Sequence, residues 1–471
     1  PVIAGAITAV SAAAVVAIIS LWIGRNQALE GEKRATEGER KATAALQETE
    51  ETLQFAMKMV DQTLVRLGKE TLLDQPGMQP LTADIYAQAL RSYEQLLPKL
   101  EKNQRLPKDI AKVQLQMGFA TKKLGKPKEA LALLEKAATS LELLRDANRT
   151  DGELLESLSL AKIQIGTIHY EQQRFAAAAI PFQDALLLRR EFAELEPENI
   201  EAGQLLANSE MNVGLLQEAL GKPQEALEYY QAANARRKTL LKKAPDNSGL
   251  LRDRAKGLTN IGLLLAHQNK LAEAEKNYDE ARQAFAKLAE HKDHQINDLH
   301  DLGISWMRLG DAAAVRNNSA DLQLAVDRYY KALRVLEGLV VANPNVPSYR
   351  GTLGKTRLNL AQLYERQDNS REAFAQLTIA FDELQKLQTT DATYGKYRTR
   401  AFFEMLRLKK WKKLSPSELQ DFEEWLNFAA LENGVPWVES MQKLAQTASE
   451  LPEVQLEGTG FESLEPPTKD R

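Results

Sequence analysis

Three histidines and two aspartates stand close together in the chain, and both residue types bind metal ions. His291, His294 and His300 lie beside Asp293 and Asp298, and imidazole and carboxylate groups are ordinary zinc ligands. No second metal-binding signature accompanies them, and polar residues are expected at a turn between helices. We interpret this cluster as part of a solvated loop, and we expect neither a metal nor another cofactor.

Residues that could carry out catalysis are not organised into a site. The chain contains no cysteine, which excludes thiolate nucleophiles, iron–sulfur clusters and disulfides. Its acidic residues are scattered over helix faces that we expect to be exposed, and no Ser-His-Asp set can be assembled from the sequence. We therefore expect no catalytic residue in this chain.

The charge of the chain disfavours a nucleic acid as its partner. Lys and Arg number 61 against 65 Asp and Glu, a net charge of −4, so no global cationic field attracts DNA or RNA. One basic patch around a tryptophan could touch lipid headgroups or an acidic partner, and the alternative is the solvated face of a terminal helix. It consists of Arg407, Lys409, Lys410, Trp411, Lys412 and Lys413.

Polar side chains that can hydrogen-bond a peptide main chain recur at a nearly constant spacing. A side-chain amide offers both donors and an acceptor, so it can pair with the peptide group of a bound segment. The alternative is that these side chains cap or bridge neighbouring helices, as buried amides generally do. The six residues are Gln116, Gln164, Asn212, Asn260, Arg308 and Asn359.

This spacing belongs to an internal repeat of 48 residues, seen in five glycines from Gly118 to Gly310. A second series consists of alanines, each followed at +4 by a large apolar or aromatic residue and at +7 by another alanine. Steps of four and seven place all three on one helical face. The interval between Ala274 and Ala325 is 51 residues, which predicts a three-residue insertion in the polar turn at 316–319. The alanines are Ala130, Ala178, Ala226, Ala274, Ala325 and Ala373.

The alternation of small and large residues predicts a stack of helical hairpins. Glycine and alanine allow two helix backbones to approach closely, while the large residue fills the space that the helix of the next repeat must cover. Turn signals at 220–223 separate the two helices of one hairpin, and those at 196–199 join successive hairpins. No strand pattern competes with this interpretation.

At these residues the chain resembles the tetratricopeptide repeat (TPR) family, whose small, alanine, aromatic and alanine pattern is met in six units. The usual TPR period is about 34 residues, so a 48-residue period implies roughly two extra turns on each helix. The resemblance implies an all-α solenoid in which the six polar residues above line a concave peptide-binding groove. Residues 82–100 repeat the second-helix pattern once more, as a leading half-repeat.

The first residues are apolar enough to cross a membrane. Residues 2–24 carry no charge, and a helix of this length rises roughly 34 Å, enough for a hydrocarbon core of about 30 Å. A signal peptide is the alternative, although its apolar stretch is shorter. The basic stalk at 25–45 would stay cytoplasmic if the residues before the span carried fewer Lys and Arg residues.

The pattern of residues 46–67 predicts an amphipathic helix that packs on the next helix, with a dimerising coiled coil as the alternative.

Residues 72–81, preceded by this span and followed by long repeats, are similar to the carboxy-terminal half of membrane-bound serine/threonine protein kinases of planctomycete bacteria. The resemblance covers residues 1–390 and implies a cytoplasmic kinase domain before Pro1. The kinase motifs themselves are not in this sequence. A single span after such a domain implies periplasmic repeats, which conflicts with the basic stalk, so the side of the membrane stays open.

The sequence therefore predicts an all-α, single-pass membrane scaffold that binds a protein or peptide, as the non-catalytic sensor or docking region of a bacterial kinase. The alternative is a free-standing membrane adaptor for envelope or secretion assemblies. The stalk could also mediate self-association. Crowded aromatic residues predict capping helices over the last apolar face. The predicted parts are a transmembrane helix (1–24), a charged stalk (25–45), leading helices with a half-repeat (46–105), six repeats (106–390), capping helices (391–451) and a disordered tail (452–471).

Overall fold

The computed structural model describes residues 79–102, 107–291 and 295–387, together with residues 394, 397, 398, 400, 401 and 404. The predicted transmembrane span, the stalk, the helix expected at 46–67, the basic patch and the disordered tail lie outside the described residues, as does most of the predicted cap. Within the described ranges, no helix is both long and apolar enough to cross a bilayer. A membrane anchor at residues 2–24 therefore stays a prediction.

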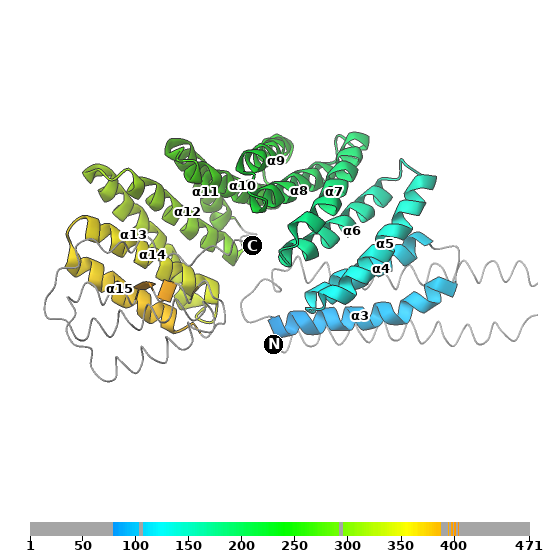
Figure 1. The fold of residues 1–471 in the computed structure, drawn as a ribbon, viewed down its shortest axis with the longest axis horizontal. Helices are drawn as coiled ribbons and strands as arrows, with labels where there is room; N and C mark the ends of the chain where they lie inside the picture. Colours follow the sequence, from blue (N-terminus) through cyan, green and yellow to red (C-terminus); the bar gives the residue numbers. More distant parts are fainter. Residues whose placement is uncertain are drawn as a thin grey trace, which may run out of the picture. The chain divides into compact units, whose positions relative to one another are not determined.

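The described part of the chain contains thirteen α-helices and no β-strand, which confirms the predicted all-α class. After α3, which contains the leading half-repeat, the helices alternate as the first and second arms of six antiparallel hairpins (Figure 1). The helices are α3 (Gln79–Lys102), α4 (Pro107–Lys123), α5 (Pro127–Ala147), α6 (Gly152–Glu171), α7 (Phe175–Leu195), α8 (Ile200–Ala219), α9 (Pro223–Lys243), α10 (Ser248–His267), α11 (Leu271–Glu290), α12 (Ile296–Val315), α13 (Ser319–Ala342), α14 (Pro347–Arg366) and α15 (Ser370–Gln385).

The five repeat glycines allow the two arms of the first five hairpins to pack closely. A Cβ atom placed on Gly118 would lie 2.7 Å from Leu134 Cγ, and one on Gly214 would lie 2.5 Å from Tyr230 Cε1. Both distances are far below the optimal 3.5–4.0 Å between carbon atoms, so a side chain at these positions would displace its neighbour. The large residue therefore packs within its own hairpin, and not only beneath the next repeat as the sequence pattern predicts.

Each hairpin turns through one residue in the left-handed backbone region, with φ between 52° and 75°. After α6, the Arg174 N–H donates to the His169 carbonyl oxygen (2.9 Å) and the Gln173 N–H to that of Tyr170 (2.8 Å). This pair of bonds is the Schellman helix cap, which favours glycine at its left-handed residue. The residues at this position are Gly125, Gln173, Gly221, Asn269, Asn317 and Asp368.

The three inserted residues lie in a helix. α12 ends at Val315 and α13 begins at Ser319, so this turn has the same three residues as the other hairpin turns. α13 has 24 residues, three more than α9. The Asn318 side chain accepts a hydrogen bond from the Asp321 N–H (3.0 Å) and so caps a helix that starts one turn early. The prediction that the insertion lies in the turn at 316–319 is therefore wrong.

Residues up to Ile296 and residues from Asn297 onward form two compact units, here called unit 1 and unit 2. In unit 1 the apolar core passes from one hairpin to the next, because Leu141 of α5, Leu158 of α6 and Phe192 of α7 belong to one cluster of buried side chains. In unit 2, Ala401 is buried against α14 and α15, at the place where a cap is expected.

Candidate functional site

The six predicted peptide-binding residues lie one on the first helix of each hairpin. An α-helix turns about 100° per residue, so a side chain two residues before a repeat glycine lies roughly 200° from it. Because that glycine, or Ala361 in the sixth hairpin, faces the second helix of its hairpin, these side chains lie on the opposite face of the first helix. All six are partly exposed. They are Gln116 on α4, Gln164 on α6, Asn212 on α8, Asn260 on α10, Arg308 on α12 and Asn359 on α14.

In unit 1 the four amides have no hydrogen-bond partner among the described residues. Buried amides are generally satisfied within the protein, so partly exposed amides without an internal partner remain available to water or to a ligand. One such side chain stands on each of four successive first helices. We call Gln116, Gln164, Asn212 and Asn260 the amide row.

In unit 2 the equivalent side chains are held by an aspartate that the sequence did not single out. The Asn359 amide donates to Asp311 Oδ1 (2.9 Å), and Arg308 lies 3.5 Å from Asp311 Oδ2. The buried Tyr329 hydroxyl also donates to Asp311 Oδ1 (2.8 Å). Here the bridging role that the sequence left open as an alternative is the one that the geometry shows. The signal for it was an acidic residue directly after Gly310.

A cavity of about 220 Å³ lies beside the first residue of the amide row. α3 contributes Tyr93, α4 contributes Lys112 and Gln116, and α6 contributes Glu156 and Ser157. We call it the α4–α6 cavity. Its other lining residues are Val113, Leu115, Glu153 and Leu160.

The two carboxylates of the α4–α6 cavity differ in their surroundings. Glu153 forms ion pairs with Lys108 and Lys112, both on α4. The Glu156 carboxylate has no hydrogen bond or ion pair among the described residues. Burial raises the pKa of Glu156 above its ordinary value, and the nearby Glu201 carboxylate raises this pKa further, while the charges of Arg189 and Lys112 offset only part of the increase. Glu156 is therefore the carboxylate of the cavity that no direct ion pair or hydrogen bond compensates.

Two arginines at equivalent positions, 48 residues apart, bind two of the second helices of unit 1, α7 and α9, to the hairpins that follow them. Arg189 Nη1 donates to the Leu205 carbonyl oxygen and Arg237 Nη1 to that of Asp253, both at 3.0 Å. Arg189 is only 4% exposed, and burial lowers its pKa to about 10. Sequence reasoning missed both residues, although an arginine at a position that holds Leu141 in the first repeat was a visible signal.

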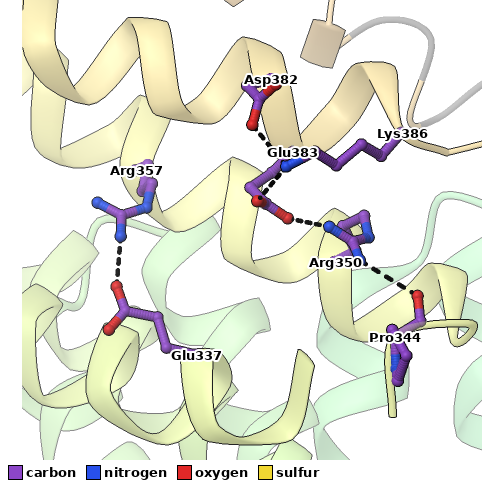
Figure 2. A network of polar contacts seen from close by, with 7 residues as sticks. All are labelled: Glu337, Pro344, Arg350, Arg357, Asp382, Glu383 and Lys386. Atoms are coloured by element: carbon purple, nitrogen blue, oxygen red, sulfur yellow. Dashed lines mark hydrogen bonds and ion pairs between the residues drawn. The ribbon is translucent and has the colours of Figure 1, made fainter. Parts of the chain in front are cut away.

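The polar residues of α14 in unit 2 are largely engaged by its neighbours. Figure 2 shows Arg350 paired with Glu383 of α15 and Arg357 paired with Glu337 of α13. Arg350 also donates to the Pro344 carbonyl oxygen (3.2 Å). Lys386, the C-cap residue of α15, bridges Asp382 (2.6 Å) and Glu383 (3.1 Å). The two arginine pairs bind α14 to α13 and to α15.

The interpretation of the histidine cluster as a solvated loop is wrong for His300. This residue lies within α12, its Nε2 is 2.9 Å from Thr352 Oγ1, and its ring centroid is 4.9 Å from that of Tyr349. Burial lowers its pKa to about 4. Asp293 and His294 lie outside the described residues, and within the described ranges no three His, Asp or Glu side chains are grouped to hold a metal ion.

No protein-family model and no curated protein matches this chain. Among solved structures it is similar to BtubC (BKLC) from P. vanneervenii, with 18% identity, a TM-score of 0.42, and coverage of 55% of this chain and 92% of that one. It is also similar to the quorum sensor NprR from B. thuringiensis in its apo form, with 11% identity, a TM-score of 0.43, and coverage of 78% and 90%. A tetratricopeptide repeat protein from Parabacteroides merdae shows 17% identity, a TM-score of 0.35, and coverage of 72% and 97%.

The successive two-helix hairpins, the contact between each repeat glycine and its large partner, and the shared turn geometry give this chain a TPR-like helical repeat fold. Folds of this class present extended surfaces for protein or peptide binding. The amide row and the α4–α6 cavity are the features of unit 1 that such binding would use.

Proposed function

We propose that this chain is a scaffold that captures an extended peptide, or an extended segment of a protein, along the amide row of unit 1. The observation that carries the proposal is the set of four partly exposed amides with no internal partner, one on each of α4, α6, α8 and α10. An extended main chain presents donors and acceptors along its whole length, which side-chain amides can match without reading sequence. The surface therefore suits partners of varied sequence.

Unit 2 is proposed to contribute less to this binding. Asn359 and Arg308 already interact with Asp311, so their polar atoms are less available to a ligand. We therefore expect substitutions in the amide row to weaken peptide binding more than substitutions of Arg308 or Asn359.

We further propose that residues 2–24 anchor the scaffold in a membrane and that the chain is the sensor or docking region of a bacterial serine/threonine protein kinase. The apolar length of residues 2–24 and the resemblance at residues 72–81 support this. A free-standing membrane adaptor is the alternative. The gene upstream of Pro1 distinguishes the two: an in-frame kinase domain supports the first, and a nearby start codon supports the second.

Peptide binding is tested by replacing Asn212 and Asn260 together with alanine in the full chain. Each lost hydrogen bond is worth about 0.5–1.5 kcal/mol, so we expect the affinity for peptides selected from a synthetic 12-residue array to fall about tenfold. The melting temperature should stay nearly unchanged. Asn277→Ala on α11 is the matched control, because its amide donates to the Glu273 carbonyl oxygen (2.8 Å) of its own helix. A large fall in melting temperature with binding intact would show that the amides are scaffolding.

A further inference from the structure

The α4–α6 cavity has the size and walls for one side chain. Its volume of about 220 Å³ is below the roughly 300–1,000 Å³ of pockets that enclose a whole small molecule. Val113, Leu115 and Leu160 give it apolar walls, and Tyr93 adds an aromatic ring. These residues suit a side chain with an aliphatic stem.

The charges of the cavity favour a cationic group at the end of that side chain. Lys112 and Glu153 pair with each other, and Lys108 adds a second positive charge to Glu153. The Glu156 carboxylate has no hydrogen bond or ion pair among the described residues, and it lies next to the apolar walls. An anionic ligand group would be repelled by this carboxylate, and an apolar group would bury the carboxylate without a compensating partner, which is unfavourable. A cationic group compensates the carboxylate.

Two polar groups of the cavity can accept hydrogen bonds from such a cation. The Ser157 hydroxyl and the Gln116 side-chain oxygen are acceptors, and both residues line the cavity beside Glu156. Gln116 is also the first residue of the amide row. A peptide main chain held along that row would therefore pass the cavity and could place one side chain in it.

We propose that the α4–α6 cavity binds one lysine or arginine side chain of the captured peptide, with its cationic end at Glu156. This inference rests on the proposed peptide binding and adds a residue preference to it. One position of the bound peptide is basic, while the rest of the peptide is read through its main chain.

The test uses an array of synthetic 12-residue peptides in which each position is varied among Lys, Arg, norleucine and Glu. The full chain is compared with Glu156→Gln, which removes the charge and keeps the shape. Glu228→Gln is the matched control, because Glu228 is an exposed residue of α9, does not line the cavity and is not among the charges that shift the pKa of Glu156. A second variant, Leu160→Trp, fills the cavity and keeps Glu156.

We expect the wild type to prefer Lys or Arg over norleucine at one peptide position by at least about tenfold. Both Glu156→Gln and Leu160→Trp should reduce this preference to less than about twofold, and Glu228→Gln should preserve it. Peptide binding without a basic preference, or with a preference that survives both cavity variants, overturns this inference and leaves the proposed peptide binding standing. If the wild type retains no peptide, the proposed function fails and this inference fails with it.

Discussion

Replacing Gly310 with alanine is expected to destabilise unit 2, although alanine is the better helix former. The new Cβ atom would lie 2.6 Å from Tyr329 Cε1 and 2.7 Å from Cδ1. Tyr329 cannot move aside freely, because it is 2% exposed and its hydroxyl is bonded to Asp311. The substitution therefore sets a packing cost against a gain in helix propensity.

The two effects can be separated with a second glycine of the same unit. Alanine stabilises a helix interior by about 0.5–1 kcal/mol relative to glycine, whereas overpacking a well-packed site costs about 1–3 kcal/mol. Gly338→Ala on α13 has no atom within 4 Å of the new Cβ, so only the helix gain applies. The free energy of unfolding should fall by about 0–2.5 kcal/mol for Gly310→Ala and rise by about 0.5–1 kcal/mol for Gly338→Ala.

Hydrogen exchange of the α12 and α13 amides measures the local free energy of opening in the full chain. The difference between the two variants isolates the packing cost, about 1–3 kcal/mol. If both alanines stabilise these helices equally, the repeat glycines are not packing contacts, and the physical explanation of the 48-residue pattern fails.

Three further predictions concern stability. Burial lowers the pKa of His300 from 6.5 to about 4, so the neutral imidazole contributes fully to the free energy of unfolding of unit 2 above pH 6.5, and this contribution is lost as the pH falls toward 4. His300→Gln should flatten that decline, as measured by urea unfolding at each pH. A pH profile that the substitution leaves unchanged would contradict this assignment. Arg189→Leu removes the donors to Ser159 and Ser209 and should lower the free energy of unfolding by about 1–3 kcal/mol, with faster exchange of the α8 amides. Gln173 has a left-handed backbone (φ 57°), so Gln173→Gly relieves strain and should raise the free energy of unfolding by about 1–2 kcal/mol. Gly221→Ala introduces the same strain and should lower the free energy of unfolding by a similar amount. Melting temperatures that shift in the same direction in both variants would refute the turn geometry.

The period of the glycines and alanines was enough to predict the hairpins, because each repeat glycine makes room for the large side chain of the facing helix. The pattern could not say where the insertion between Gly310 and Ala325 would lie. A polar turn is the usual place for extra residues, but Asn318 is also a good N-cap, and here the cap extends the helix. Position in the sequence alone does not decide between these two outcomes.

The candidate site was predictable only in part. The spacing placed the amide row on one face of the first helices, since the angle between an amide and its repeat glycine follows from helix geometry. The bridging of Asn359 by Asp311 depends on a contact across 48 residues, and the burial of His300 depends on the packing of α14 against α12. The α4–α6 cavity likewise combines residues of three helices, which no local pattern brings together.

Site-specific photo-crosslinking tests the central claim most directly. A photoreactive phenylalanine analogue is introduced in the full chain at Asn212, within the amide row, or at Ile180, which is 72% exposed on the second-helix arm α7. A peptide selected from the array is then added and irradiated. We predict crosslinks from position 212 and none from position 180. Crosslinks from position 180 alone would contradict binding along the amide row and would place the partner on the opposite arm of the hairpins.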